Sequence, residues 1–311
     1  MKASSGQQTK ILAIGGGKGG VGKTLISSNI AILLAKYGKR TIVIDADFGC
    51  SNLHTCLGMG KPDRSLADFV SKPARISDME DVAVETPYPN LRLISAHVDV
   101  TPLINMHHAT KGKFIRSVQK LKADYVILDL GAGSTQDRID MFLTADWGVV
   151  VVTPEPTSVE NVYSFLKNCI FRMTMELFKG NSVITDILKK YAENPQQTFK
   201  TRHLIEEIGE FRPEMAEKLQ NTLKEVRPLI IMNMVREDGD RRVGQGLEEI
   251  IRKYLLLEAK FIGYLPYDMA VVQHMREARP VAAADENATS VKSLKNIVGQ
   301  INFMNKNSET P

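Results

Sequence analysis

Residues 10–24 read KILAIGGGKGGVGKT, and this stretch decides the fold class. The segment Gly15 to Thr24 satisfies the pattern G-x-x-x-x-G-K-[ST], with Gly17 and Gly22 as its framing glycines. An apolar β-branched run precedes the pattern, and apolar residues at helical spacing follow it. In such a loop the backbone N–H groups turn inward around a phosphate, and the following helix adds its positive dipole end. The stretch therefore predicts a phosphate-binding loop between a strand and a helix.

Short β-branched runs alternate with helical patterns along most of the chain. Between the first two runs, apolar residues from Ile26 to Tyr37 recur at helical spacing, and Gly38 follows where a helix C-terminal cap is expected. This alternation predicts an α/β P-loop NTPase fold, a mostly parallel, doubly wound sheet covered by helices on both faces. The runs are ILAI at 11–14, TIVI at 41–44, YVILDL at 125–130, WGVVVV at 147–152, LIIMNM at 229–234 and FIGYL at 261–265.

The stretch 172–227 breaks this alternation, because it has three apolar stripes at helical spacing and no strand pattern. We therefore predict a single P-loop domain over 1–311 with a helical insertion at 172–227. The charges of the insertion are mixed in sign, which favours solvated helix faces over a dedicated partner surface. Its stripes are Ile184, Ile187, Leu188 and Tyr191, then Leu204, Ile205 and Ile208, then Met215, Leu219 and Leu223.

Composition and charge exclude several classes of protein. Forty Lys plus Arg against thirty-six Asp plus Glu leave a net charge of +4, too small to imply a polyanionic partner by itself. Cys50, Cys56 and Cys169 have no CxxC spacing, so neither a disulfide framework nor a zinc site is expected. The N-terminus MKASSGQQTK has no signal-peptide pattern, and no apolar run reaches the roughly 18 to 20 residues of a membrane span. We expect a cytoplasmic protein, with peripheral association with a membrane or cell pole left open.

Three residues of the loop carry the expected phosphate chemistry. Lys23 is expected to pair with the β and γ phosphates, and the Thr24 hydroxyl to bind Mg²⁺. A second lysine, Lys18, stands inside the same loop. Two cations from one chain crowd awkwardly onto one triphosphate, so we expect Lys18 to reach across a dimer into the partner's phosphates. The alternative is a solvated loop lysine.

Carboxylates end two of the predicted strands. Asp45 and Asp47 close TIVIDAD, and Asp129 closes YVILDL. The carboxyl edge of a parallel sheet faces the ligand crevice, so these residues are candidates for holding Mg²⁺ or orienting the attacking water. The alternative for Asp45 and Asp47 is a pair of surface turn carboxylates.

The strings GGGKGGVGKT, VIDADFGCSNL and ILDLGAG, in that order, resemble the deviant Walker A ATPases, the group of ParA, MinD and the flagellar number regulator FlhG. The resemblance extends over 149–167, 229–236 and 263–281, and the TPEPTS run at 153–158 is most similar to MinD and FlhG members. It implies a Mg²⁺-dependent ATPase that dimerises on ATP, acts as a spatial or numerical positioning switch, and hydrolyses slowly until it dimerises or meets an activating protein.

The resemblance also implies roles for particular residues. Lys18 becomes the signature lysine that acts on the partner's ATP, with Lys23 as a phosphate contact and Asp47 as the residue that activates water. Thr24, Asp45 and Asp129 surround Mg²⁺. The expected ATP contacts are Gly17, Lys18, Gly19, Gly20, Val21, Gly22, Lys23, Thr24 and Leu25, together with Asn233, Arg236, Pro266 and Asp268 around the adenine. Without the resemblance, Asn233 reads as a capped strand end.

Other functions were weighed against the positioning switch. A ParA-like, DNA-associated segregation or regulatory ATPase would use a basic surface, and the stretch His107 to Lys122 is basic, although a solvated helix face is the favoured interpretation. Iron–sulfur relatives need cysteines that bridge a dimer, and Cys50 and Cys56 lack that arrangement. No guanine signature of the Asn-Lys-x-Asp type is present, which favours ATP over GTP.

The last apolar stripe predicts a core helix rather than a membrane-binding one. Only NFMNKNSETP follows it, which is too short and too polar for a further anchoring helix. Expected partners are therefore a second copy of the chain and an unidentified activating protein, with a membrane surface left open. The stripe consists of Val291, Leu294, Ile297, Val298 and Ile301.

Overall fold

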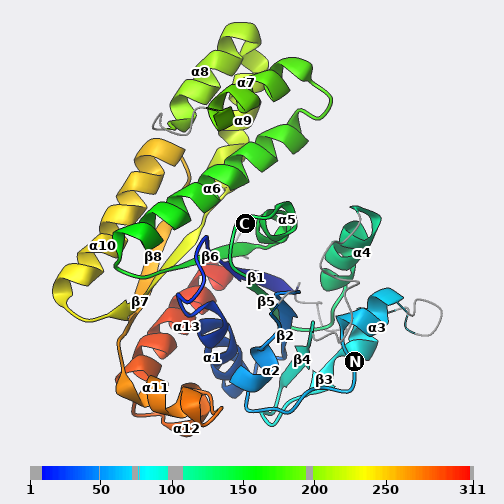
Figure 1. Ribbon diagram of the computed structural model, residues 1–311, viewed down its shortest axis with the longest axis vertical. Helices are drawn as coiled ribbons and strands as arrows, with labels where there is room; N and C mark the ends of the chain where they lie inside the picture. Colours follow the sequence, from blue (N-terminus) through cyan, green and yellow to red (C-terminus); the bar gives the residue numbers. More distant parts are fainter. Residues whose placement is uncertain are drawn as a thin grey trace.

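The computed structural model describes residues 9–48, 50–71, 76, 78–96, 108–193 and 199–308, which form an eight-stranded sheet with helices on both faces (Figure 1). The strand order is β3-β4-β2-β5-β1-β6-β7-β8. All pairings are parallel except the one between β3 and β4. The strands are β1 Lys10–Gly15, β2 Thr41–Ala46, β3 Val84–Glu85, β4 Leu91–Ile94, β5 Tyr125–Leu130, β6 Trp147–Val152, β7 Leu229–Val235 and β8 Lys260–Pro266.

The predicted fold class and all six predicted strands are confirmed. Two further strands, β3 and β4, were not predicted, and they close one edge of the sheet. The strand β4 is only four residues long and carries Arg92, whose guanidinium lies 2.5 Å from the carboxylate of Glu80. The alternation of Leu91, Arg92 and Leu93 covers too few residues to distinguish a strand from a loop.

Side chains alternate between two hydrophobic layers along the central strand. Leu12 and Ile14 of β1 face one layer, and Ile11 and Ala13 face the other. One layer contains α1 Lys23–Lys36, α2 Leu53–Cys56, α12 Val281–Ala284 and α13 Thr289–Ser308. The opposite layer contains α3 Leu66–Ser71, the 3-10 turn η1 Met79–Val82, α4 His108–Val118, α5 Gln136–Thr144, α6 Pro156–Leu177 and α10 Asp238–Ile250 with its π-helical continuation η2 Ile251–Leu255.

The helix α1 follows the phosphate loop and is buried over nearly its whole length. It ends where the sequence predicts, because Gly38 takes a φ of 77°, the left-handed conformation that closes many helices. Tyr37, expected within the apolar stripe, is instead 50% exposed, since it lies at the end of the helix beyond the sheet.

Three helices lie between α6 and β7 and gather at one end of α6 (Figure 1). All ten residues of the predicted stripes are buried or partly buried there. The predicted start of the insertion at 172 lies within α6, which runs without interruption to Leu177. The three helices are α7 Ser182–Glu193, α8 Thr201–Phe211 and α9 Pro213–Glu225.

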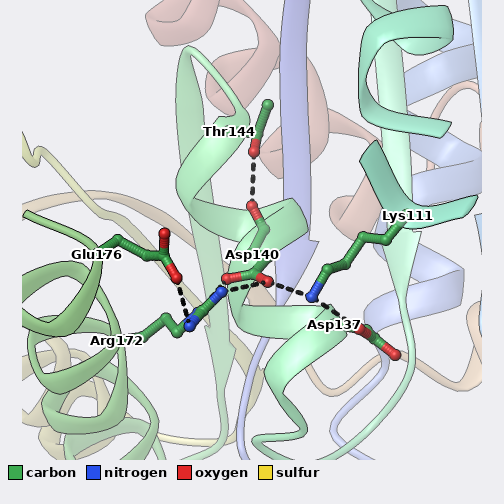
Figure 2. Close-up of polar contacts among 6 residues, drawn as sticks. All are labelled: Lys111, Asp137, Asp140, Thr144, Arg172 and Glu176. Carbon is green, nitrogen blue, oxygen red and sulfur yellow. Dashed lines mark hydrogen bonds and ion pairs between the residues drawn. The ribbon is translucent and has the colours of Figure 1, made fainter. Parts of the chain in front are cut away.

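A cluster of charges joins α4, α5 and α6 (Figure 2). The carboxylate of Asp140 accepts hydrogen bonds from Lys111 at 2.5 Å and from Arg172 at 2.6 Å. Lys111 also pairs with Asp137 at 3.1 Å, and Arg172 with Glu176 at 2.8 Å. Lys111 was expected on a solvated face, and the structure corrects this, because the residue is only 7% exposed and is held by two carboxylates.

The C-terminal stripe is confirmed as core. All five residues of the stripe on α13 are fully buried against the sheet. Within the part of the chain that the structure describes, no helix combines the length and the apolar composition of a membrane span. Two further elements, β8 and α11 Met269–Arg276, lead from the sheet toward this helix.

Asp140→Asn should destabilise the fold, because it removes the shared acceptor of two largely buried cations. We expect a loss of about 3 kcal/mol at pH 7, measured by chemical or thermal unfolding. Asp186→Asn is the matched control, since Asp186 forms an exposed pair with Lys189 on α7 and its loss should cost less than about 0.5 kcal/mol. Equal stability of the two variants would contradict this account.

The same substitution has a predictable pH dependence. Burial by itself raises the pKa of Asp140, but hydrogen bonds from Arg172 and Lys111 outweigh it and hold the pKa below its ordinary value. A carboxyl whose pKa is lowered by folding stabilises the fold above its unfolded pKa of about 3.9, and this contribution is lost as pH falls through the folded value. The difference in stability between wild type and Asp140→Asn should therefore shrink below a pH of about 4.

Candidate functional site

The phosphate loop leaves β1 at Gly15 and enters α1 at Lys23, at the carboxyl edge of the sheet. Gly20 and Gly22 have φ values of 78° and 91°, a region that strains residues with a side chain. A Cβ on Gly22 would lie 2.2 Å from the amide nitrogen of Asn233, so space also requires glycine there. Gly17 packs against α6, where a Cβ would lie 2.4 Å from the Asn161 carbonyl oxygen.

A cavity of about 370 Å³ opens in front of this loop. It brings together elements that are far apart in sequence: the phosphate loop, the ends of β2, β5, β7 and β8, and α11. The lining includes these predicted residues: Gly19, Gly20, Gly22, Lys23, Thr24, Leu25, Asp47, Asn233, Pro266 and Asp268. Gly17, Lys18, Val21, Arg236, Asp45 and Asp129 lie behind or beside that lining.

Lys23 is 7% exposed, and its ammonium donates to the backbone carbonyl of Lys18 at 2.9 Å. Burial lowers the pKa of Lys23, opposed by the nearby carboxylates of Asp129 and Asp47 and assisted by the positive charge of Arg138. The ammonium is thus folded over the loop, where a phosphate held by the loop would meet it.

Lys18 behaves differently from Lys23. Its ammonium donates to the Thr157 hydroxyl at 3.0 Å, on an exposed part of the surface at the start of α6. It does not line the cavity of its own chain. The ammonium of Lys23 therefore lies inside the phosphate loop, whereas that of Lys18 lies on the surface beside α6.

Asp45 and Asp129 lie side by side on adjacent strands and are 1% and 2% exposed. Desolvation and the negative charge of Asp45 raise the pKa of Asp129 to about 7, although Ser27 donates to it at 2.8 Å and Thr24 also hydrogen-bonds it. Burial raises the pKa of Asp45 as well. Two adjacent buried carboxylates with a threonine hydroxyl are hard oxygen donors, and they fit a Mg²⁺ ion that completes its shell with phosphate oxygens and water.

The carboxylate of Asp45 has a structural task too. It accepts from the Ser51 hydroxyl at 2.7 Å and from the backbone N–H groups of Leu53 and Asp47, both at 3.1 Å. It therefore holds the loop that carries Asp47 toward the cavity. Of the three predicted metal residues, Thr24 alone lines the cavity, with Asp45 and Asp129 packed behind it.

Arg138, in the first turn of α5, is a charged neighbour of the site that the sequence analysis missed. Its guanidinium lies 3.2 Å from the Asp47 carboxylate. The pair joins residues 91 positions apart, so no local pattern indicates it. Its place shortly after the glycines of YVILDLGAG is the one signal that would have drawn attention to it.

Another part of the cavity lining comes from the ends of β7 and β8 and from α11. The amide nitrogen of Asn233 donates to the Val21 carbonyl at 2.8 Å, which ties the end of β7 to the phosphate loop. The next residue, Met234, adopts a φ of 59° where β7 shifts register against β8, and it lines the cavity. Sequence analysis missed Met234, because a β-bulge has no pattern in a single apolar run.

Two other predicted adenine neighbours have contacts of their own. The guanidinium of Arg236 lies over the ring of Tyr267, 5.0 Å from its centroid. Tyr267 lines the cavity, whereas Arg236 does not. The Asp268 carboxylate caps α11 by accepting from the backbone of Ala270 at 2.9 Å and also accepts from the backbone of Ser290 at 3.2 Å. Asp268 therefore lines the cavity while its carboxylate is hydrogen-bonded to the backbone.

Two curated relatives match about half of this chain. The antiactivator FleN of Pseudomonas aeruginosa is 30% identical over 160 residues, 51% of this chain and 55% of that protein. The flagellum site-determining protein YlxH of Helicobacter pylori is 32% identical over 162 residues, 51% of this chain and 53% of that protein. The chain thus spans about half the length of these curated relatives.

Among solved structures, the septum site-determining protein MinD of Pyrococcus horikoshii, complexed with Mg-ADP, superposes with a TM-score of 0.65. It covers 97% of this chain and all of the MinD chain, at 17% sequence identity, so the likeness concerns the fold. The family model of the CobQ/CobB/MinD/ParA nucleotide binding domain matches residues 12–281. That match includes the phosphate loop, both strand-end carboxylates and Asn233, and the chain therefore belongs to the CobQ/CobB/MinD/ParA nucleotide-binding family.

Proposed function

We propose that this chain is a Mg²⁺-dependent ATPase that dimerises on ATP and acts as a spatial or numerical positioning switch of the flagellum or division-site type. The observation that carries the proposal is the division of the two loop lysines, with Lys23 folded over the loop and Lys18 turned outward to Thr157. An outward cation next to a phosphate loop is placed to serve a second molecule. The names of YlxH and MinD, site-determining for flagellum and septum, support the positioning role.

In the proposed reaction, the loop and α1 bind the triphosphate through backbone N–H groups, and Lys23 pairs with the β and γ phosphates. Thr24 and the Asp45 and Asp129 pair hold Mg²⁺ and its waters. Bound Mg²⁺ neutralises the charge that develops on the transferred phosphoryl group. Asp47, at the cavity wall, orients the attacking water. Gly17, Gly19, Gly20, Val21, Gly22 and Leu25 form the rest of the phosphate side, with Asn233, Arg236, Pro266 and Asp268 around the adenine.

In the proposed dimer, each cavity receives a second lysine, the partner's Lys18. The cavity of a single chain has one inward lysine, and a cation supplied across an interface accelerates phosphoryl transfer by roughly 10³ to 10⁵. ATP hydrolysis in the monomer should accordingly be slow, and dimerisation or an activating protein should raise it. The two nucleotide states then present different surfaces to partners, which is the basis of a switch.

A DNA-associated role receives less support from the structure. Lys111 is buried in the charge cluster of Figure 2, and the ammonium of Lys113 lies 4.2 Å from the ring centroid of Phe69. The basic stretch therefore loses part of the charge that phosphate contacts need. His107, which was counted in that stretch, lies outside the described residues. The cytoplasmic location and any membrane contact remain part of the proposal.

Dimerisation is tested by measuring solution mass by light scattering in Mg-ATP and in Mg-ADP, alongside ATP turnover. Asp47→Ala should remain dimeric in ATP and lose turnover, because the nucleotide that holds the dimer is no longer hydrolysed. Lys18→Ala should be monomeric in ATP, with turnover lower by roughly 10³-fold. Lys224→Ala, an exposed lysine on α9, is the matched control and should behave as wild type. A wild type that stays monomeric in ATP would sink the trans-lysine mechanism.

Base selection is tested at Asn233. With its amide nitrogen bonded to Val21, the side-chain oxygen is the atom available to accept from the 6-amino group of adenine, which guanine lacks. Asn233→Ala should reduce the ratio of ATP to GTP affinity by about 10-fold, the equivalent of one buried hydrogen bond. Calorimetric titration with both nucleotides gives the ratio. Asn221→Ala, exposed on α9, should leave it unchanged, and an unaltered ratio in Asn233→Ala would remove the proposed role.

A further inference from the structure

Arg138 couples α5 to Asp47, the predicted water-orienting residue. Its Nη2 atom lies 3.2 Å from Oδ1 of Asp47, with 23% of the arginine side chain and 26% of the aspartate side chain exposed. This is a single contact, so the guanidinium keeps donors that the carboxylate does not use. The pair is neither deeply buried nor fully solvated, which allows it to form and break.

The guanidinium of Arg138 is not part of the cavity lining but lies directly behind it, against Gly131. Gly131 and Asp47 both line the cavity. A Cβ built on Gly131 would be 2.4 Å from Oδ1 of Asp47 and 2.6 Å from Nη2 of Arg138, so both charged groups lie against this glycine. The wall at Gly131 has no side chain to separate the guanidinium from the phosphate side of the cavity, where Lys23 and Thr24 lie.

The backbone that carries Arg138 is anchored on its other side. Asp137 and Asp140, its neighbours on α5, are held by Lys111 of α4 and Arg172 of α6 (Figure 2). The helix α5 is thereby fixed to two other helices. A change of charge in the cavity can therefore move the Arg138 side chain without displacing the helix.

We propose that Arg138 senses the γ-phosphate: it holds Asp47 when no triphosphate is present, and it moves its guanidinium onto the γ-phosphate when Mg-ATP binds. A terminal phosphate carries more negative charge than one carboxylate, and its oxygens match the guanidinium fork in two places. Transfer of Arg138 to the phosphate frees Asp47 to orient water. ADP has no γ-phosphate, so Arg138 stays with Asp47. The inference rests on the ATPase function proposed above.

The test compares Mg-AMP-PNP with Mg-ADP by isothermal titration calorimetry. All variants carry Lys18→Ala, so that the protein stays monomeric and the affinities report one site. Arg138→Ala should weaken AMP-PNP binding by about 10-fold and change ADP binding by less than about 2-fold, because the lost hydrogen bonds go to the γ-phosphate alone and the Asp47 contact given up for them offsets part of their free energy. Arg138→Lys should recover part of the loss. Arg202→Ala, exposed on α8, is the matched control and should change neither affinity.

A double-mutant cycle separates sensing from a purely structural role. Asp47→Asn should strengthen AMP-PNP binding more in the protein that has Arg138 than in Arg138→Ala. With Arg138 present, the substitution removes the carboxylate that competes with the γ-phosphate for the guanidinium. Equal gains in the two backgrounds, or equal weakening of both nucleotides by Arg138→Ala, would overturn the inference. If Arg138→Ala does not fold, Arg138→Lys and Asp47→Asn give the same comparison.

The outcomes also distinguish this inference from the function on which it rests. A protein that binds neither nucleotide, with or without Lys18, contradicts the ATPase proposal and this inference together. A protein that binds both nucleotides, with an affinity ratio insensitive to Arg138, contradicts only the sensing role.

Discussion

Two carboxylates buried side by side impose the constraint on which this site depends. Asp45 and Asp129 are register partners on β2 and β5, each almost without exposure, and like charges at such a place are costly in a low dielectric. Hydrogen bonds and one nearby positive charge offset part of that cost. Ser27 and Thr24 donate to Asp129, the loop after β2 donates three hydrogen bonds to Asp45, and Lys23 brings a buried ammonium nearby. The remaining negative charge is what a divalent cation would balance.

The sheet order brings these groups together. Because β1 lies between β5 and β6, with β2 on the far side of β5, the phosphate loop emerges beside the ends of the strands that carry both carboxylates. The glycines of the loop then let its backbone and the start of α1 approach the cavity closely. From the other side, the side chain of Asn233 at the end of β7 donates to the Val21 carbonyl of the loop. The phosphate loop is thus held between the carboxylates of β2 and β5 on one side and Asn233 of β7 on the other.

The parts of the site that sequence analysis found are those encoded within one short segment. The phosphate loop, Asp45, Asp47 and Asp129 each lie at the end of an apolar strand run, and the carboxyl edge of a parallel sheet follows from that run. Arg138 and Thr157 were missed because their partners lie 91 and 139 residues away. Lys111 was misplaced for the same reason, since its burial depends on carboxylates of α5 that a basic stretch does not reveal. The bulge at Met234 has no periodic signal, and the alternation in β4 is too short to be recognised.

The helix α6 contacts both Lys18 and the three helices α7, α8 and α9. In its first turn, the Thr157 hydroxyl accepts a hydrogen bond from the ammonium of Lys18, and Gly17 packs against the helix at Asn161. Farther along, Arg172 joins Asp140 of α5, and the end of the helix leads into α7, α8 and α9 (Figure 1). Twenty-two residues of α-helix span about 33 Å. The phosphate loop and the charge cluster of α5 therefore contact the same rigid element, one at its start and the other past its middle. Lys18, and the helix α5 that carries Arg138, are thus both held by α6.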